Sequence, residues 1–329
     1  VYGAVFAWPA FLRSWLTATL TWGVLPVGAV AILMTHGLTG GAWGKHSRPV
    51  WLALAATMPL FIAAMLPLLF GLDQLFSWTQ PAIQLPEDVQ HKLGYLNEPF
   101  FIARNAIYFT FWLGLTGLLG VWQKRSWPIY APGLILWVFA VTFFAVDWLM
   151  SLEPLFYSDV FGLMMISGTA ASSFAFGLLL VVANMEPAIR KDLANLWLSV
   201  LLGWVFMMFA QLIIIWSGNI PHEIIWYVHR YKYPWPIINW AAFALYLVVP
   251  FAILLSTAAK RTRKWLTIAT VLSLIGHLLF VQWLVLPAFK DWLPAQTWLD
   301  PAALIALGAG FVWIVGKRLE RQEASHGEV

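Results

Sequence analysis

The sequence contains no cysteine and very little charge. With 0 cysteines among 329 residues, the chain has no disulfide, no thiolate metal site and no iron–sulfur ligand. Charged residues make up only 10% of the chain, against roughly a quarter in soluble domains. Pairs of histidines at helical spacing, which bis-histidine haem ligation across a bundle needs, are lacking too, since His277 alone lies well inside an apolar run. We therefore expect no haem and no other redox cofactor bound by this chain, except an organic one such as a quinone.

Apolar residues are present in excess. Hydrophobic residues make up 61% of the chain, and its mean hydropathy is +0.77. A water-soluble fold of this length cannot hide so much apolar surface, because most of any folded surface faces water. The composition thus excludes a soluble enzyme, a disordered chain and a nucleic-acid-binding module. It predicts an all-α polytopic membrane protein, with many of the 22 tryptophans at the lipid–water interface.

Nine apolar runs are long enough to cross a hydrocarbon core of about 30 Å. They are Trp15–Met34, Val50–Leu72, Phe100–Trp122, Ala131–Leu149, Val160–Ala183, Leu193–Ser217, Pro236–Thr257, Trp265–Pro287 and Pro301–Lys317. The apolar start, Val1–Phe11, lacks the features of a signal peptide and is compatible with the end of a tenth helix. We expect one integral membrane domain over residues 1–329, ending in a polar cytoplasmic tail at 319–329.

Lysine and arginine are distributed unevenly between alternate loops. One side of the predicted membrane carries thirteen, which are Lys45, Arg48, Lys124, Arg125, Arg190, Lys191, Lys260, Arg261, Arg263, Lys264, Lys317, Arg318 and Arg321. The other side carries five, which are Arg13, Lys92, Arg230, Lys232 and Lys290. Because cytoplasmic loops are enriched in these residues, we expect a cytoplasmic C-terminus and a periplasmic visible N-terminus.

A few charged residues lie inside the predicted spans, where each is costly unless it is paired. Arg104 is about one turn from the outer end of the third span, and Asp147 is near the outer end of the fourth. Because consecutive spans are antiparallel, the two side chains should meet at one depth. Polar residues expected near them are Glu153, Gln211, His222, Glu223 and Arg230. Two interpretations stay open: a proton- or quinone-associated site facing the periplasm, or a structural network that locks helices together.

Hydroxyl groups form a second polar pattern. In the eighth span they make a stripe about 120° wide that leads to His277 near mid-membrane. The stripe consists of Thr267, Thr270 and Ser273, and the fifth span adds Ser167 and Ser172. They could relay protons between two half-channels, or they could simply allow close helix packing. Prolines at 59, 67 and 250 should kink the second and seventh spans.

Three multi-residue segments resemble those of one membrane-protein family. They are Tyr95–Phe109 (YLNEPFFIARNAIYF), Val146–Pro154 (VDWLMSLEP) and Gln211–Glu223 (QLIIIWSGNIPHE). The run LTGGAWG at Leu38–Gly44 and Pro250–Phe251 also fit. In this order they are similar to the ActF-type integral membrane subunit of bacterial alternative complex III, a quinol:electron-acceptor oxidoreductase. The resemblance covers most of the chain.

This resemblance implies a fold of two four-helix bundles plus flanking helices, akin to NrfD/PsrC-like membrane subunits. It also implies a bacterial inner-membrane location among lipids and a set of partner subunits. These are a C-type paralogue that binds the quinol, multihaem cytochromes c and a periplasmic iron–sulfur subunit, which together hold the haem and the iron–sulfur clusters. The F-type subunit is considered for proton movement or scaffolding, and the polar residues of the three segments inherit its motif positions.

The sequence therefore predicts a membrane subunit of a quinol:cytochrome c (or other acceptor) oxidoreductase, with no catalytic residue and no metal site of its own. The first alternative is a purely structural anchor for haem and iron–sulfur subunits. The second is a quinol-binding subunit with a site near Arg104, Asp147 and His222. A secondary transporter is a further alternative, which the absence of a visible inverted repeat disfavours.

Overall fold

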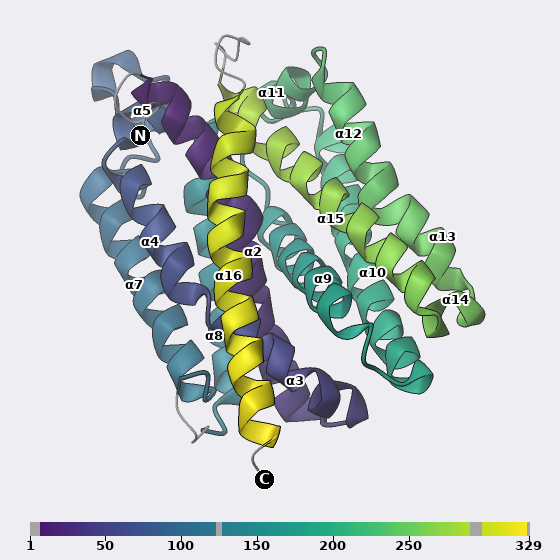
Figure 1. Ribbon diagram of the computed structural model, residues 1–329. Coiled ribbons are helices and arrows are strands. Elements are labelled where there is room, and N and C mark those ends of the chain that lie inside the picture. Colours follow the sequence, from purple (N-terminus) through teal and green to yellow (C-terminus); the bar gives the residue numbers. More distant parts are fainter. Residues whose placement is uncertain (1–6, 123–126, 290–297, 328–329) are drawn as a thin grey trace.

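The computed structural model describes residues 7–122, 127–289 and 298–327, except for the side chains of residues 222 and 323–327. In this part of the chain every regular element is a helix, so the predicted all-α class is confirmed (Figure 1). The long helices are α2 (Trp8–Thr39), α3 (Ala42–Ala55), α4 (Met58–Leu69), α7 (Glu98–Leu118), α8 (Tyr130–Trp148), α9 (Phe161–Val181), α10 (Pro187–Gly218), α15 (Arg263–Val285) and α16 (Leu299–Gly327). The shorter ones are α5 (Leu72–Leu75), η1 (Ser77–Thr79), η2 (Ala82–Gln84), α6 (Glu87–Gln90), η3 (Met150–Leu152), α11 (Pro221–Arg230), α12 (Trp235–Phe243), the π-helix η4 (Ala244–Val248), α13 (Val249–Leu255), α14 (Thr257–Arg261) and η5 (Leu286–Ala288).

Eight helical segments of the described chain are long and apolar enough to cross a membrane, among them α3–α4 and α12–η4–α13 taken as continuous segments. Helix α7, the third predicted span, is also of spanning length with 21 residues. It is more polar than the eight because Arg104 and Asn105 lie in it, and both side chains are buried against the protein. The chain is accordingly an all-α multi-pass membrane protein.

Several helices differ from the predicted spans in their ends or their continuity. The second span is two helices, α3 and α4, which are separated by a turn at Ala56–Thr57 just before Pro59. The seventh is α12 and α13 joined by the π-helix η4, with Pro250 in the first turn of α13. Helix α16 continues to Gly327, so it takes in most of the segment predicted as a polar tail. Residues 328–329 of that tail lie outside the described residues.

The helices pack as two groups of four, and the long helix α2 lies where the two groups meet. Helices α2, α4, α7 and α8 contact one another, and α9, α10, α12–α13 and α15 form the second group. Helix α2 also packs against α9, which joins the groups, while α16 lies along α2 and α3 (Figure 1). This arrangement agrees with the expected two four-helix bundles and a flanking helix.

The connections lie at two opposite ends of the molecule. Figure 1 shows α5 and α11 at one end, and α3 and α14 at the other. The described cations of the larger predicted set belong to the α3/α14 end, and those of the smaller set belong to the α5/α11 end. Lys124, Arg125 and Lys290 of that count lie outside the described residues. The loops with many cations and the loops with few thus lie at opposite ends of the described molecule, as the charge pattern predicted.

The π-helix η4 depends on a glycine in the neighbouring helix α15. A Cβ atom added at Gly276 would lie 2.3 Å from the backbone nitrogen of Tyr246. The Ser273 hydroxyl, one turn earlier in α15, donates to the carbonyl of Tyr246 at 3.3 Å. That carbonyl has no ordinary α-helical donor four residues later, because the residue there is Pro250. Gly276 therefore lets α15 come close enough for Ser273 to donate to the Tyr246 carbonyl, which lacks its α-helical donor.

We predict that Gly276→Ala destabilises the protein by about 1–3 kcal/mol, because the new methyl group meets fixed backbone rather than a side chain that can move. Thermal unfolding of the detergent-solubilised chain measures the effect. Gly114→Ala in α7 is the matched control, since an added Cβ there has no atom within 4 Å. Equal melting temperatures for Gly276→Ala and the control would contradict this account of the helix contact.

Candidate functional site: two buried ion-pair clusters

The predicted ion pair between α7 and α8 is present. The Arg104 guanidinium donates from Nε to Asp147 Oδ2 at 3.0 Å and from Nη2 to Oδ1 at 2.8 Å. Both side chains are buried. Two parallel bonds between a guanidinium and a carboxylate fix the relative position of the two groups as well as compensating their charges. This contact therefore sets how α7 and α8 meet near the α5/α11 end.

Further groups complete the hydrogen bonding of this pair. Arg104 Nη1 donates to the carbonyl of Tyr95 at 2.9 Å, and the Tyr108 hydroxyl donates to Asp147 Oδ2 at 3.0 Å. The guanidinium lies over the rings of Tyr95 and Phe100, 3.7 and 4.3 Å from their centroids. Both carboxylate oxygens and three guanidinium nitrogens thus have partners. We name these five residues the α7–α8 cluster.

A second cluster joins the segment after α8 to α11. Glu153 accepts from Arg230 Nη1 at 2.5 Å and is 2.5 Å from Nδ1 of His229. Arg230 also donates to the carbonyls of Trp226 at 2.9 Å and Leu284 at 2.7 Å, and its guanidinium stacks over the Trp226 ring at 3.6 Å. Because Leu284 belongs to α15, this second group, the α11 cluster, ties α11 to both the α8 side and the second bundle.

Weaker contacts extend from the α11 cluster toward α10. Gln211 accepts from the Ser158 hydroxyl at 3.3 Å and donates to the Tyr227 hydroxyl at 3.4 Å. Glu223 accepts a hydrogen bond from Tyr157, and together with its negative charge this raises the pKa of the Tyr157 phenol above the ordinary value. Gln211 and Glu223 are both buried. They therefore belong to the polar layer that the sequence predicted.

The polar layer is divided rather than continuous. The carboxylates of Asp147 and Glu153 share no hydrogen-bonding partner among the described residues. The sequence placed both in one constellation, and the structure instead assigns one to each cluster. His222 lies in α11, but its side chain is outside the described residues, so the predicted role of His222 is not addressed by the geometry.

The α11 cluster borders a large opening at the α5/α11 end. This cavity has a volume of about 740 Å³ and is lined by Glu153 and His229 at one side and by Arg13 and Asp73 at another. Nothing in the sequence groups Arg13 with Asp73, because they belong to α2 and α5 and line one cavity only in the folded chain. The opening gives Glu153 and His229 a route to solvent.

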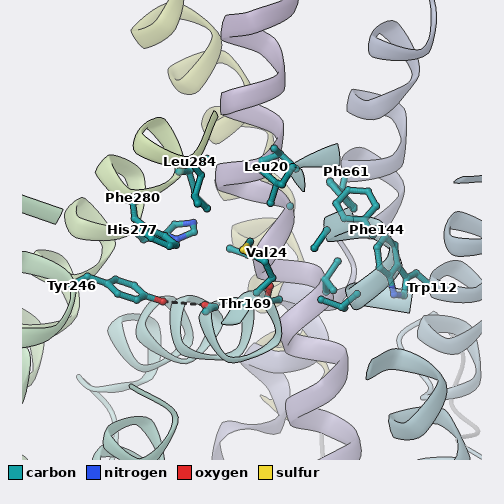
Figure 2. A pocket seen from close by; sticks show the side chains of 18 residues that line it. Leu20, Val24, Phe61, Trp112, Phe144, Thr169, Tyr246, His277, Phe280 and Leu284 are labelled. Carbon is teal, nitrogen blue, oxygen red and sulfur yellow. Dashed lines mark hydrogen bonds between the residues drawn. The ribbon is translucent and has the colours of Figure 1, made fainter. Parts of the chain in front are cut away.

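His277 lies where the two bundles meet. Its Nε2 is 3.1 Å from the carbonyl of Thr21 in α2, so this nitrogen carries the proton, because a carbonyl can only accept. The imidazole forms part of the wall of a cavity of about 50 Å³. Figure 2 shows His277, Tyr246 and Phe280 at one side of this cavity, with Phe61, Phe144 and Trp112 at the other. The walls are almost entirely apolar.

The hydroxyl groups of α15 are bonded to nearby backbone. Thr270 donates to the carbonyls of Thr267 at 3.0 Å and Leu266 at 2.9 Å. Ser273 donates to the carbonyl of Tyr246. Thr267 itself is half-buried. Hydroxyls that donate to carbonyls in this way are ordinary in membrane helices. The bonds favour the packing interpretation of the stripe over a relay that ends at His277.

The two hydroxyls of α9 that the sequence singled out differ in their partners. Ser167 donates to the carbonyl of Leu163 at 2.9 Å within its own helix. Ser172 is 2.8 Å from the Tyr246 hydroxyl, which donates to the carbonyl of Gly168 at 3.0 Å. Sequence reasoning missed Tyr246, although a tyrosine in the middle of an apolar span is a signal that its hydroxyl needs a buried partner. This tyrosine links η4 to α9 across the second bundle.

Among the described residues, no group of three or more His, Asp or Glu side chains is arranged to hold a metal ion. In comparison with known proteins, no family model and no curated protein matches the chain. The arrangement of the two clusters therefore has to be interpreted from its own geometry.

We predict that Arg104→Leu destabilises the protein by about 3–5 kcal/mol, because it leaves the buried Asp147 carboxylate without its counter-charge. The double variant Arg104→Leu/Asp147→Leu should be less destabilised than Arg104→Leu. Unfolding in mixed detergent micelles measures both. Glu320→Gln, which removes the exposed pair with Lys317, is the control and should change stability little. A single Arg104→Leu variant as stable as the control would refute a clamping role for the pair.

Proposed function

We propose that this chain is a membrane subunit of a quinol-oxidising respiratory complex, which passes electrons to cytochrome c or another acceptor. One observation carries the proposal: the three segments on which the family resemblance rests are joined by direct contacts. Arg104 of the first segment binds Asp147 of the second, and Glu153 of the second binds Arg230, which follows the third. Residues that are distant in sequence but carry one resemblance thus form one layer of the molecule.

The proposed orientation follows from the charges. The α3/α14 end carries the larger set of cations and is assigned to the cytoplasm of a bacterial inner membrane, with the α5/α11 end in the periplasm. Large apolar side chains are unusually exposed at the α5/α11 end, with Ile83 at 92%, Tyr231 at 83% and Tyr233 at 84%. Exposed aromatic groups of this kind suit a protein partner.

The proposed role of the chain within the complex is to dock its partners. These are a C-type quinol-binding membrane paralogue, multihaem cytochrome c subunits and a periplasmic iron–sulfur subunit, and they would hold the haem and iron–sulfur groups. The hydrogen bonding of Arg104 and Asp147 in the α7–α8 cluster supports a fixed scaffold, because an ion pair whose charged atoms all have partners resists rearrangement. Quinol binding by this chain is a less favoured role, since Arg104 and Asp147 are already occupied by each other.

We expect the tagged chain, purified in mild detergent from its native membrane, to carry c-type haem and quinol-dependent reductase activity. The double variant Ile83→Asp/Tyr233→Ala should lose the haem-containing subunits, because it disrupts the exposed apolar surface at the α5/α11 end. The control is Leu38→Asp at the opposite end, where Leu38 is also exposed. Absorbance of reduced haem per mole of chain is the measurement. A wild-type chain that purifies without haem proteins would contradict the proposed function.

Proton movement is the second candidate role, and one observation favours it: His277 lies beside a cavity between the bundles rather than in solid packing. If protons pass here, His277→Leu and Asp147→Asn should each lower the number of protons released per electron in sealed vesicles that contain the complex. The reductase rate per complex serves as the control for assembly. An unchanged stoichiometry in an assembled complex would leave the scaffold role alone.

A further inference from the structure

An apolar groove lies at the α3/α14 end, on the outside of the second bundle. It has a volume of about 560 Å³, within the roughly 300–1,000 Å³ typical of ligand sites. Its walls come from α13, α14 and the first turn of α15, and they include Val249, Ala252 and Trp265. Two polar side chains, Ser256 and Thr262, stand where the helices change direction. The groove is therefore apolar along α13 and polar at the corner.

Four cations lie next in sequence to the lining residues Ala259, Thr262 and Trp265, although none of the four is itself a lining residue. They are Lys260, Arg261, Arg263 and Lys264, and all but the first are exposed. Among the described residues, none of the four has a carboxylate within ion-pair distance. Glu186 and Asp192 lie at the start of the neighbouring α10, and Arg190 and Lys191 beside them add further positive charge. Within the described chain, these four cations are thus in no ion pair that would compete with an anionic ligand.

The short helix α14 places the cations beside the apolar walls. Ser256 caps α14 by accepting from the backbone N–H of Ala259 at 3.3 Å, and Thr262 donates to the carbonyl of Ala258 at 2.9 Å. Arg190 of α10 donates to the carbonyl of Arg261 at 3.3 Å. These bonds turn the chain twice within a few residues between α13 and α15, and the groove lies at these turns.

We propose that this groove binds an anionic glycerophospholipid, with one acyl chain along α13 and the headgroup phosphate among the four cations. Charge complementarity selects the ligand, because unpaired lysines and arginines at the end of membrane spans attract anionic headgroups. The surroundings select a lipid, because most of the α12–α13 span is not buried within the chain and Trp265 is half-exposed next to the cations in the sequence. An indole is favoured at the lipid–water interface. This site is independent of the proposed respiratory function.

The test uses the full chain in phosphatidylcholine vesicles that contain a minor fraction of acyl-brominated phosphatidylglycerol or acyl-brominated phosphatidylcholine. Bromine quenches nearby tryptophan fluorescence, and the difference between the wild type and Trp265→Phe isolates the signal of the groove. We expect brominated phosphatidylglycerol to quench Trp265 at no more than about one fifth of the concentration that brominated phosphatidylcholine requires, because even a single cation near the surface contributes about fivefold.

Two variants distinguish the contribution of the four cations to lipid binding from that of the apolar groove. Neutralising the four cations by substitution with Gln should abolish the preference for phosphatidylglycerol while both lipids still quench. Ala252→Trp, which fills an exposed wall of the groove without changing charge, should reduce the phosphatidylglycerol retained by the purified chain in native mass spectrometry. Lys45→Gln/Arg48→Gln is the control, because it removes two cations at the same end of the molecule but away from the groove, and it should keep the preference.

Equal quenching by the two lipids in the wild type would overturn the proposal, and so would a preference that survives removal of the four cations. A photo-crosslinker placed at Trp265 in native membranes tests whether a protein chain occupies the groove instead of a lipid. If it captures a protein chain instead of lipid, the groove is a protein interface and the lipid assignment is wrong.

Discussion

The bidentate bond between Arg104 and Asp147 constrains the whole α5/α11 end of the molecule. Each group alone would cost several kcal/mol inside an apolar bundle, and their mutual attraction offsets that cost only when the remaining donors and acceptors are also filled. The carbonyl of Tyr95 and the hydroxyl of Tyr108 fill them. The segment before α7 must therefore return to the helix, and α7 must present one face to α8. A single pair of charges thereby determines how a loop and two helices are arranged.

The same device is used a second time, in the other bundle. Arg230, like Arg104, binds a carboxylate, donates to backbone carbonyls and lies flat over an aromatic ring. In both clusters an arginine is used, and a lysine would not do, because only a guanidinium offers a planar fork with several donors and a face for stacking. Each four-helix bundle thus contacts one buried arginine–carboxylate pair, and both pairs lie at the α5/α11 end. The opposite end lacks such buried clusters among the described residues.

Much of this fold was predictable because membrane solvation imposes simple rules. Apolar length gave the spans, and the cost of lone charges predicted that Arg104 would meet Asp147. The break between α3 and α4 and the π-helix at Tyr246 were not predicted in form, because Pro59 and Pro250 indicate a disturbance without saying which geometry absorbs it. The division into two clusters was also missed, since the partner of Glu153 depends on how the loops fold. For the hydroxyl stripe the sequence left a proton relay and close packing open. Periodicity alone does not say whether a hydroxyl binds a carbonyl of its own helix, as that of Ser167 does, or a group on another helix, as that of Ser273 does.

The π-helix η4 has a consequence for any comparison of this chain with others. A π-turn accommodates one residue more than an α-turn does, so the helix before it and the helix after it are out of phase by about 100°. Losing one residue within Ala244–Val248 would rotate α13 relative to α12 and turn the lipid-facing side of α13 inward. A related protein with an uninterrupted helix here would need a gap of one position in its alignment, and its buried and exposed faces beyond that gap would match this chain only when the gap is placed inside the π-turn.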